Sequence, residues 1–254
     1  MLRRVYPAPA VALSIPTDAA SINEGRRLAI LRGCLGGCHG KRAEGAVLFD
    51  DPVIARVVAP NLTAAVRRYS DAELAAAIRQ GVRPGGRSML VMPSDAFSGL
   101  TDDDLGRIIA CLRSLPPVEG PGPGLSLGPV GRIGLATRKF KTTAQEIAEL
   151  IPPADATREQ ATRGRYLART ICGQCHGTSP RGASNSGFTS PNLSVVAAYS
   201  ADGFAQLMGT GVALAGRRLG VMRETAEQSL SQLTDTEIAD LYSYLHDMPD
   251  AAHN

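Results

Sequence analysis

Apolar residues recur at helical spacing in three segments of each half of the chain. In the first half these segments begin at Ser21, Ser70 and Thr101, residue types that favour helix N-caps, and the middle one ends at Gly81, which suits a helix C-terminus. The corresponding segments of the second half are residues 163–171, 200–208 and 234–245. No segment shows the sustained alternation of apolar and polar residues that is typical of a half-buried strand. The pattern therefore predicts an all-α fold.

The two halves also repeat each other in sequence. From Tyr69 to Met92 the matching positions lie 130 residues apart, and later ones lie 133 apart. An ordered series of matches at a nearly fixed offset indicates duplication. The matched pairs are Pro60-Asn61-Leu62 with Pro191-Asn192-Leu193, Tyr69-Ser70 with Tyr199-Ser200, Gly81-Val82 with Gly211-Val212, Gly86-Arg87 with Gly216-Arg217, and Leu100-Thr101-Asp102 with Leu233-Thr234-Asp235.

The duplication predicts two tandem domains, residues 20–118 and 158–254, with residues 1–19 as an N-terminal extension. Residues 119–157 are expected to form a Pro/Gly-rich linker that packs along the outside of both domains. Its first part is too rich in Pro and Gly for a helix or a central strand, whereas residues 135–151 can form one basic amphipathic helix.

Composition narrows the class of protein. The chain has 254 residues, of which 44% are hydrophobic and only 4% aromatic, with no Trp. Two small helical domains with long loops and few aromatic residues have little to fill their cores, so we expect a large group to occupy each centre. The net charge of +3 and the absence of a basic run argue against nucleic-acid binding. No stretch reaches the length of a membrane span, and early prolines interrupt any signal-peptide core.

Two cysteine pairs stand directly before a histidine. Cys172, Cys175 and His176 form Cys-x-x-Cys-His, the attachment sequence of c-type haem. The two thiols add to the vinyl groups of the porphyrin, and the adjacent histidine is delivered to one axial face of the iron. The sequence therefore predicts a covalently attached haem c in the second half.

The first half carries a variant of the motif, with three residues between Cys34 and Cys38 before His39. The extra residue must bulge, and Gly36-Gly37 provides the backbone freedom for it. We predict a second covalent haem c here, with attachment through one thioether or an empty site as alternatives.

Other chemistries for these cysteines remain as alternatives. A zinc site would need further ligands, for which the chain offers His246, His253 and Cys111. A redox-active cysteine pair would need a βαβ setting, which the pattern does not show. Cys111, on the apolar face of the helix after Thr101, is expected to be a buried, inert thiol.

One methionine pair matches between the halves. Met92 and Met222 share the 130-residue offset, and both are expected in a loop before the last helix, where a thioether can reach the opposite face of a haem. Met89 and Met208 align with leucine and isoleucine and are expected to pack in the interior. His/Met ligation saturates the iron, which suits electron transfer rather than substrate binding.

Further matched residues are candidates for holding the group. The carbonyls of Pro60 and Pro191 can accept from the Nδ1–H of the motif histidines, leaving Nε2 for iron, although ordinary turns would also use proline. Two arginines, Arg87 and Arg217, can pair with haem propionates or simply be solvated. Two tyrosines, Tyr69 and Tyr199, can donate to a propionate or cap the following helix.

Together these motifs resemble the class I cytochrome c family, and in particular its tandem di-haem members that serve as cytochrome subunits of periplasmic dehydrogenases. The resemblance rests on the cysteine–histidine motifs, Pro-Asn-Leu after them, Gly-Arg before the methionine, Met92-Pro93, and a last helix that begins Leu-Thr-Asp. It implies His39 and His176 as proximal ligands and Met92 and Met222 as distal ligands. One departure is that Arg223, not proline, follows the second methionine.

The resemblance also implies a function and a location. It indicates a di-haem electron carrier without catalysis of its own, working between a dehydrogenase donor and a cytochrome or oxidase acceptor. A periplasmic location follows, with inner-membrane tethering only through an N-terminal anchor absent from this chain, of which Leu2-Arg3-Arg4 would be the remnant. The alternatives are a di-haem peroxidase or a haem-based gas sensor with one displaceable distal ligand.

Overall fold

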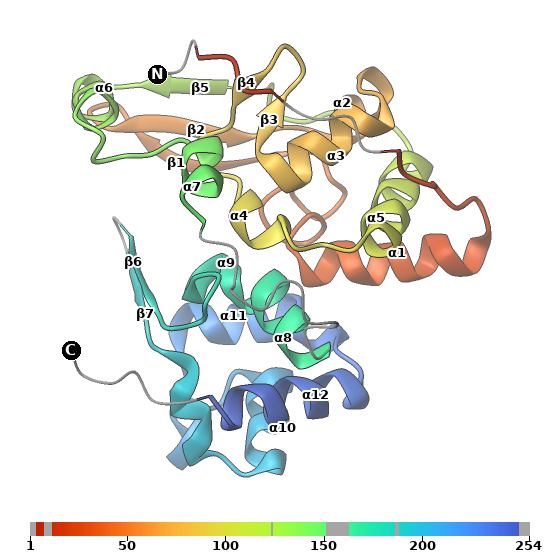
Figure 1. Ribbon diagram of the computed structural model, residues 1–254, viewed down its shortest axis with the longest axis vertical. Helices are drawn as coiled ribbons and strands as arrows, with labels where there is room; N and C mark the ends of the chain where they lie inside the picture. The colour runs from red at the N-terminus through yellow and green to blue at the C-terminus, as the bar shows by residue number, and fades with distance from the viewer. Residues whose placement is uncertain (1–3, 8–11, 123, 151–162, 186–187, 249–254) are drawn as a thin grey trace. The chain divides into compact units, whose positions relative to one another are not determined.

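The computed structural model describes residues 4–7, 12–122, 124–150, 163–185 and 188–248. The chain divides into two compact units, Met1–Leu150 and Ile151–Asn254. The ribbon runs from red to green through the first unit and from green to blue through the second (Figure 1). Each unit is described by itself below.

The first unit contains helices and three short antiparallel pairings. Its elements are α1 (Ala19–Leu31), β1 (Ala46–Asp51), β2 (Ala55–Ala59), α2 (Leu62–Arg68), α3 (Asp71–Gln80), β3 (Val82–Arg83), β4 (Arg87–Ser88), α4 (Ser94–Phe97), α5 (Asp102–Ser114), β5 (Gly124–Leu127), α6 (Pro129–Ala136) and α7 (Thr143–Glu149). The strand order is β1-β2-β5 in one sheet, and β3 pairs with β4.

The second unit repeats much of this order. Its elements are α8 (Arg163–Leu167), the π-helical turn η1 (Ala168–Cys172), α9 (Gly173–His176), β6 (Ala183–Asn185), β7 (Phe188–Ser190), α10 (Ala201–Thr210), α11 (Gly220–Gln228) and α12 (Asp235–His246), with the 3-10 turns η2 (Leu193–Ala198), η3 (Leu214–Gly216) and η4 (Leu230–Gln232). Strands β6 and β7 form a hairpin.

Helix caps account for most of the helix starts. Ser70 closes a capping box with Glu73 at the start of α3, and Thr234 closes one with Glu237 at the start of α12. The predicted cap at Thr101 is also present. The predicted cap at Ser21 is wrong: Asp18 caps α1 and its carboxylate accepts from the Ser21 amide at 2.9 Å, because an N-cap side chain bonds the amide three residues on.

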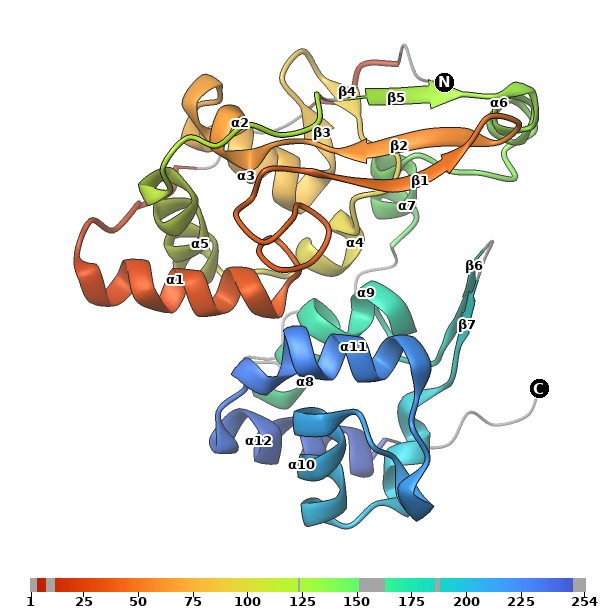
Figure 2. The same cartoon turned by 180° about the vertical axis from the view of Figure 1, so that it is seen from behind.

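The core of each unit lies where the two helices at the ends of its repeated part cross. In the first unit α1 packs on α5, as both ribbon views show (Figures 1 and 2), and a Cβ at Gly25 would collide with the Arg107 carbonyl. In the second unit α8 packs on α12, and a Cβ at Gly164 would collide with the Asp240 carbonyl. Aliphatic side chains fill both crossings, among them Leu28, Leu31, Leu105, Ile108, Ile109, Leu167, Leu241 and Leu245.

The prediction of an all-α fold is incomplete. Helices dominate, but the segment between each motif histidine and the following proline folds into a hairpin, β1–β2 in the first unit and β6–β7 in the second. The strands are short, and β1 is exposed along most of its length, so their sequences carry no alternation of apolar and polar residues.

The predicted linker also needs correction. Residues 119–150 pack with the first unit, since β5 pairs antiparallel with β2 and α7 contacts α4. The Pro/Gly-rich run forms α6, because Pro129 occupies the first helical position where its missing N–H costs nothing. The predicted helix over 135–151 is replaced by the end of α6 and by α7. Residues 151–157 lie outside the described residues.

Candidate functional site

Both motif histidines are held by a proline carbonyl. His39 Nδ1 lies 2.8 Å from the Pro60 oxygen, and His176 Nδ1 lies 2.9 Å from the Pro191 oxygen. Because a carbonyl only accepts, each Nδ1 carries the proton and donates it, and each Nε2 keeps its lone pair for a metal. These contacts are the ones that the sequence predicts.

The protonation state of these rings suits a ligand. Burial lowers the pKa of both His39 and His176 from the ordinary value, and the hydrogen bond to proline opposes this only in part. Both imidazoles are therefore neutral at neutral pH, as metal coordination requires.

The hairpins bring the prolines to the histidines. The Gly45 amide donates to the His39 carbonyl at 2.8 Å, and the Gly182 amide donates to the His176 carbonyl at 3.0 Å. Both glycines have φ near +91°, and a Cβ on either would lie within 2.8 Å of a carbonyl on the returning strand. Only glycine fits such a turn, so the two hairpins close in the same way.

The cysteines enter the two sites along different backbones. In the second unit the helix continues through the π-helical turn and α9 as far as His176. In the first unit α1 ends at Leu31, and the segment from Cys34 to His39 runs in turns, with φ of +81° at Gly36. The extra residue is thus accommodated at Gly36, as the sequence predicts, and also by loss of the helical geometry.

The thiols differ in exposure. Cys34 is buried and Cys38 exposed, whereas Cys172 and Cys175 are both half-buried. Burial raises the pKa of Cys34 and of Cys172 to about 12. Cys111 is fully buried, and burial raises its pKa as well, which confirms the expected buried thiol.

The two candidate distal methionines have different settings. Met92 lies in an irregular loop before α4, and its carbonyl accepts from the Ser94 amide at 2.8 Å and from the Thr143 hydroxyl at 3.2 Å. Met222 lies inside α11, so the expectation of a loop is wrong for it. Because Arg223 follows Met222 where Pro93 follows Met92, nothing prevents the second segment from continuing as a helix.

The remaining candidate residues are the two matched arginines and the two matched tyrosines. Arg87 and Arg217 are exposed, and their pairing with propionates stays a prediction. Tyr69 and Tyr199 end helical segments just before the serine caps of α3 and α10. The Tyr199 carbonyl accepts from the Tyr242 hydroxyl at 2.8 Å.

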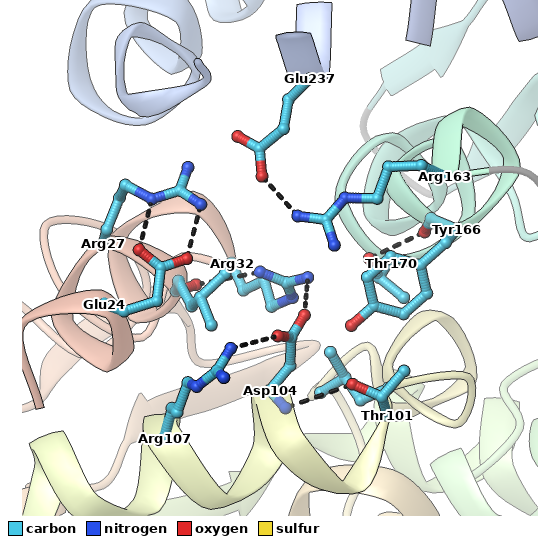
Figure 3. Close-up of polar contacts among 12 residues, drawn as sticks. Glu24, Arg27, Arg32, Thr101, Asp104, Arg107, Arg163, Tyr166, Thr170 and Glu237 are labelled. Carbon is cyan, nitrogen blue, oxygen red and sulfur yellow. Dashed lines mark hydrogen bonds and ion pairs between the residues drawn. The ribbon is translucent and has the colours of Figure 1, made fainter. Parts of the chain in front are cut away.

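Sequence reasoning missed two groups near these sites. The first is Thr143 on α7, fully buried, whose backbone amide also bonds the Met89 carbonyl at 3.1 Å. The second is the buried ion pair of Arg32 and Asp104 (Figure 3). An arginine at the end of an apolar helix is the only sign of the pair in the sequence, and Thr143 carries none.

Among the described residues, His, Cys, Asp and Glu side chains form no group of three or more that could hold a metal ion. In the same part of the chain no helix is both long and apolar enough to cross a membrane.

In comparison with known proteins, residues 161–249 match the model of the cytochrome c family. The chain is 27% identical over 273 residues to the fructose dehydrogenase cytochrome subunit of Gluconobacter japonicus, which covers 94% of the chain and 56% of that protein. It is 28% identical over 187 residues to the cytochrome c subunit of the quinone alcohol dehydrogenase of Gluconacetobacter polyoxogenes, which covers 68% of the chain and 39% of that protein.

The corresponding subunit of Komagataeibacter europaeus gives the same figures. The chain thus spans about half the length of the first of these relatives and less of the other two. It contains a cytochrome c domain in its second unit and is homologous to cytochrome subunits of dehydrogenases.

Proposed function

We propose that the chain is a di-haem electron carrier of a dehydrogenase complex. In this proposal Cys34 and Cys38 attach one haem c and Cys172 and Cys175 attach the other. The iron of the first is ligated by His39 and Met92, and the iron of the second by His176 and Met222.

One observation carries the proposal furthest, namely the repeated contact between a motif histidine and a proline carbonyl. This contact supports two equivalent sites. In both units the hydrogen bond to proline uses Nδ1 of the histidine and leaves Nε2 available to a metal. The first unit keeps this contact although its cysteine spacing departs from the usual motif. We therefore infer that both units bind the same group.

The protein's own residues have limited tasks in this function. A bound haem supplies a one-electron Fe(III)/Fe(II) couple. The proline carbonyls fix the tautomer and the orientation of the histidines, and the buried aliphatic helices exclude water. No residue needs to transfer a proton, so the chain carries electrons and catalyses no bond chemistry.

The relatives suggest the partners and the location. They are cytochrome subunits of a fructose dehydrogenase and of quinone alcohol dehydrogenases, so we infer a dehydrogenase as electron donor and another cytochrome or an oxidase as acceptor. We place the protein in the periplasm, where haem c is attached, with tethering to the inner membrane as part of the same proposal.

Carbon monoxide binding tests the ligand set. The holo-protein, produced with a signal peptide and the haem-attachment machinery, is reduced and exposed to CO. We expect no spectral change, because both irons are saturated. Met92→Ala and Met222→Ala should each open one haem to CO, while the control Met89→Leu, in the same loop as Met92, should behave as wild type.

Two results would contradict this proposal. CO binding by the wild-type protein would point to a gas sensor or a peroxidase with one displaceable ligand. Failure of a methionine variant to bind CO would remove that methionine from the ligand set.

A further inference from the structure

Helices α5 and α12 begin with the same threonine cap but use the acidic residue three positions after that cap differently. In the second unit Glu237 closes the capping box, with one carboxylate oxygen 3.1 Å from the Thr234 amide and the other 2.8 Å from Arg163. Asp104 stands at the same helical position of α5, three residues after Thr101. Its carboxylate lies 3.5 Å from Arg32 and 3.8 Å from Arg107 (Figure 3).

The two pairs also differ in burial. The side chain of Arg32 is 1% exposed and that of Asp104 is 8% exposed, whereas Arg163 is 48% exposed opposite a buried Glu237. The cation of the first pair is therefore nearly inaccessible to solvent, and that of the second is about half exposed. A charge acts over a longer range in a protein interior than in water, because the effective dielectric constant is lower.

Arg32 lies close to the first candidate attachment site. It stands two residues before Cys34, and its Nη1 donates to the Leu28 carbonyl of α1 at 3.4 Å. Its positive charge lowers the pKa of Cys34, against the larger effect of burial. The neighbouring cysteine raises the pKa in both pairs, Cys38 that of Cys34 and Cys175 that of Cys172, but no cation among the described residues lowers the pKa of Cys172.

We propose that Arg32, held in the interior by Asp104, makes the first unit the high-potential end of the chain. The inference rests on the proposed function. Reduction of a haem adds one negative charge, which a nearby buried cation stabilises. With both haems bound, the second unit would give one electron to the first, with no proton or bond transferred. Asp104 is a positioning residue that acts through Arg32.

Potentiometric titration of the holo-protein tests the proposal. We expect two one-electron waves, with the upper wave missing from the variant Cys34→Ala/Cys38→Ala, which lacks the first attachment site. Arg32→Met should lower the upper potential by at least 59 mV, which corresponds to a tenfold change in the redox equilibrium. Asp104→Asn should raise it, because the charge of Arg32 is then less compensated.

Two further variants separate charge from folding. Arg32→Met/Asp104→Asn, which buries no charge at this place, should fold and give an upper potential between those of the single variants. Glu237→Gln, the matched change in the second unit, should leave the upper wave where it is. Thermal unfolding of each variant, followed by circular dichroism, measures stability independently of the potentials.

The decisive result is that Arg32→Met and Asp104→Asn shift the upper potential in opposite directions. Partial unfolding would shift the potentials of both single variants in the same direction. The proposal is overturned if the upper wave survives loss of Cys34 and Cys38, or if Arg32→Met leaves it unmoved. A haem count by pyridine haemochrome distinguishes this failure from failure of the proposed function: one haem in the wild-type protein overturns both.

Discussion

The two cysteine–histidine segments reach the same contact by different paths. In the second unit a continuous helix carries His176 to the Pro191 carbonyl, while in the first unit the helix has ended and glycine-containing turns carry His39 to Pro60. The two Nδ1 to oxygen distances are nevertheless 2.9 and 2.8 Å. The hairpin after the motif, and not the helix before it, is thus the feature that the histidine geometry shares.

The settings of the two candidate distal methionines also differ. Met222 belongs to a helix of its own unit, whereas the Met92 loop is held by Thr143 of α7, a helix from the segment after the last helix of the repeat. The repeated part of the first unit therefore depends on a contact from the segment that follows it. The first unit has a buried ion pair and two helices, α6 and α7, after α5, and the second has the more regular motif.

The largest expected effect is the difference in cysteine reactivity between the native and the unfolded holo-protein. If both thioethers form in each unit, Cys111 is the remaining thiol, and its full burial and raised pKa predict no reaction with a thiol reagent until the protein is unfolded. Mass spectrometry after alkylation, with and without denaturant, measures this. Rapid native labelling of the exposed Cys38 would show that this residue forms no thioether.

Substituting the glycine at each helix crossing should lower the free energy of unfolding by a similar amount in both units. Gly25→Ala and Gly164→Ala each place a methyl group against a backbone carbonyl that cannot move aside, so we expect each to lower the free energy of unfolding by about 3 kcal/mol. The control Gly209→Ala, on the exposed side of α10 with no atom near the new methyl, should be neutral or stabilise by up to about 1 kcal/mol. Denaturant unfolding of the three variants makes the comparison. Equal stability of Gly164→Ala and wild type would disprove the shared crossing.

A smaller effect is expected where α7 holds the distal loop. Thr143→Val removes the hydroxyl that donates to the Met92 carbonyl and should lower the free energy of unfolding by about 1 kcal/mol. Thr143→Ser keeps the hydroxyl and serves as the control. Reduced Thr143→Val protein should also bind CO more readily at the first haem than wild type. A variant that matches wild type in both measurements would show that α7 does not support the loop.

The sequence predicts those features that depend on local chemistry. The caps at Ser70, Thr101 and Thr234 follow from hydrogen bonds within one turn of helix, and the contacts of both prolines follow from the chemistry of a liganding histidine. The hairpins, strand β5 and the Thr143 contact were missed because they depend on pairing between distant segments. Their short or exposed strands leave no periodic pattern in the sequence.

The count of haems per chain tests the central claim, that two units with different motif backbones bind the same group. A pyridine haemochrome assay against protein concentration should give two haems for the wild-type chain and one each for Cys34→Ala/Cys38→Ala and Cys172→Ala/Cys175→Ala. Cys111→Ser should retain both. One haem in the wild-type chain, unaffected by loss of Cys34 and Cys38, would contradict the account and leave the second unit as the sole redox centre.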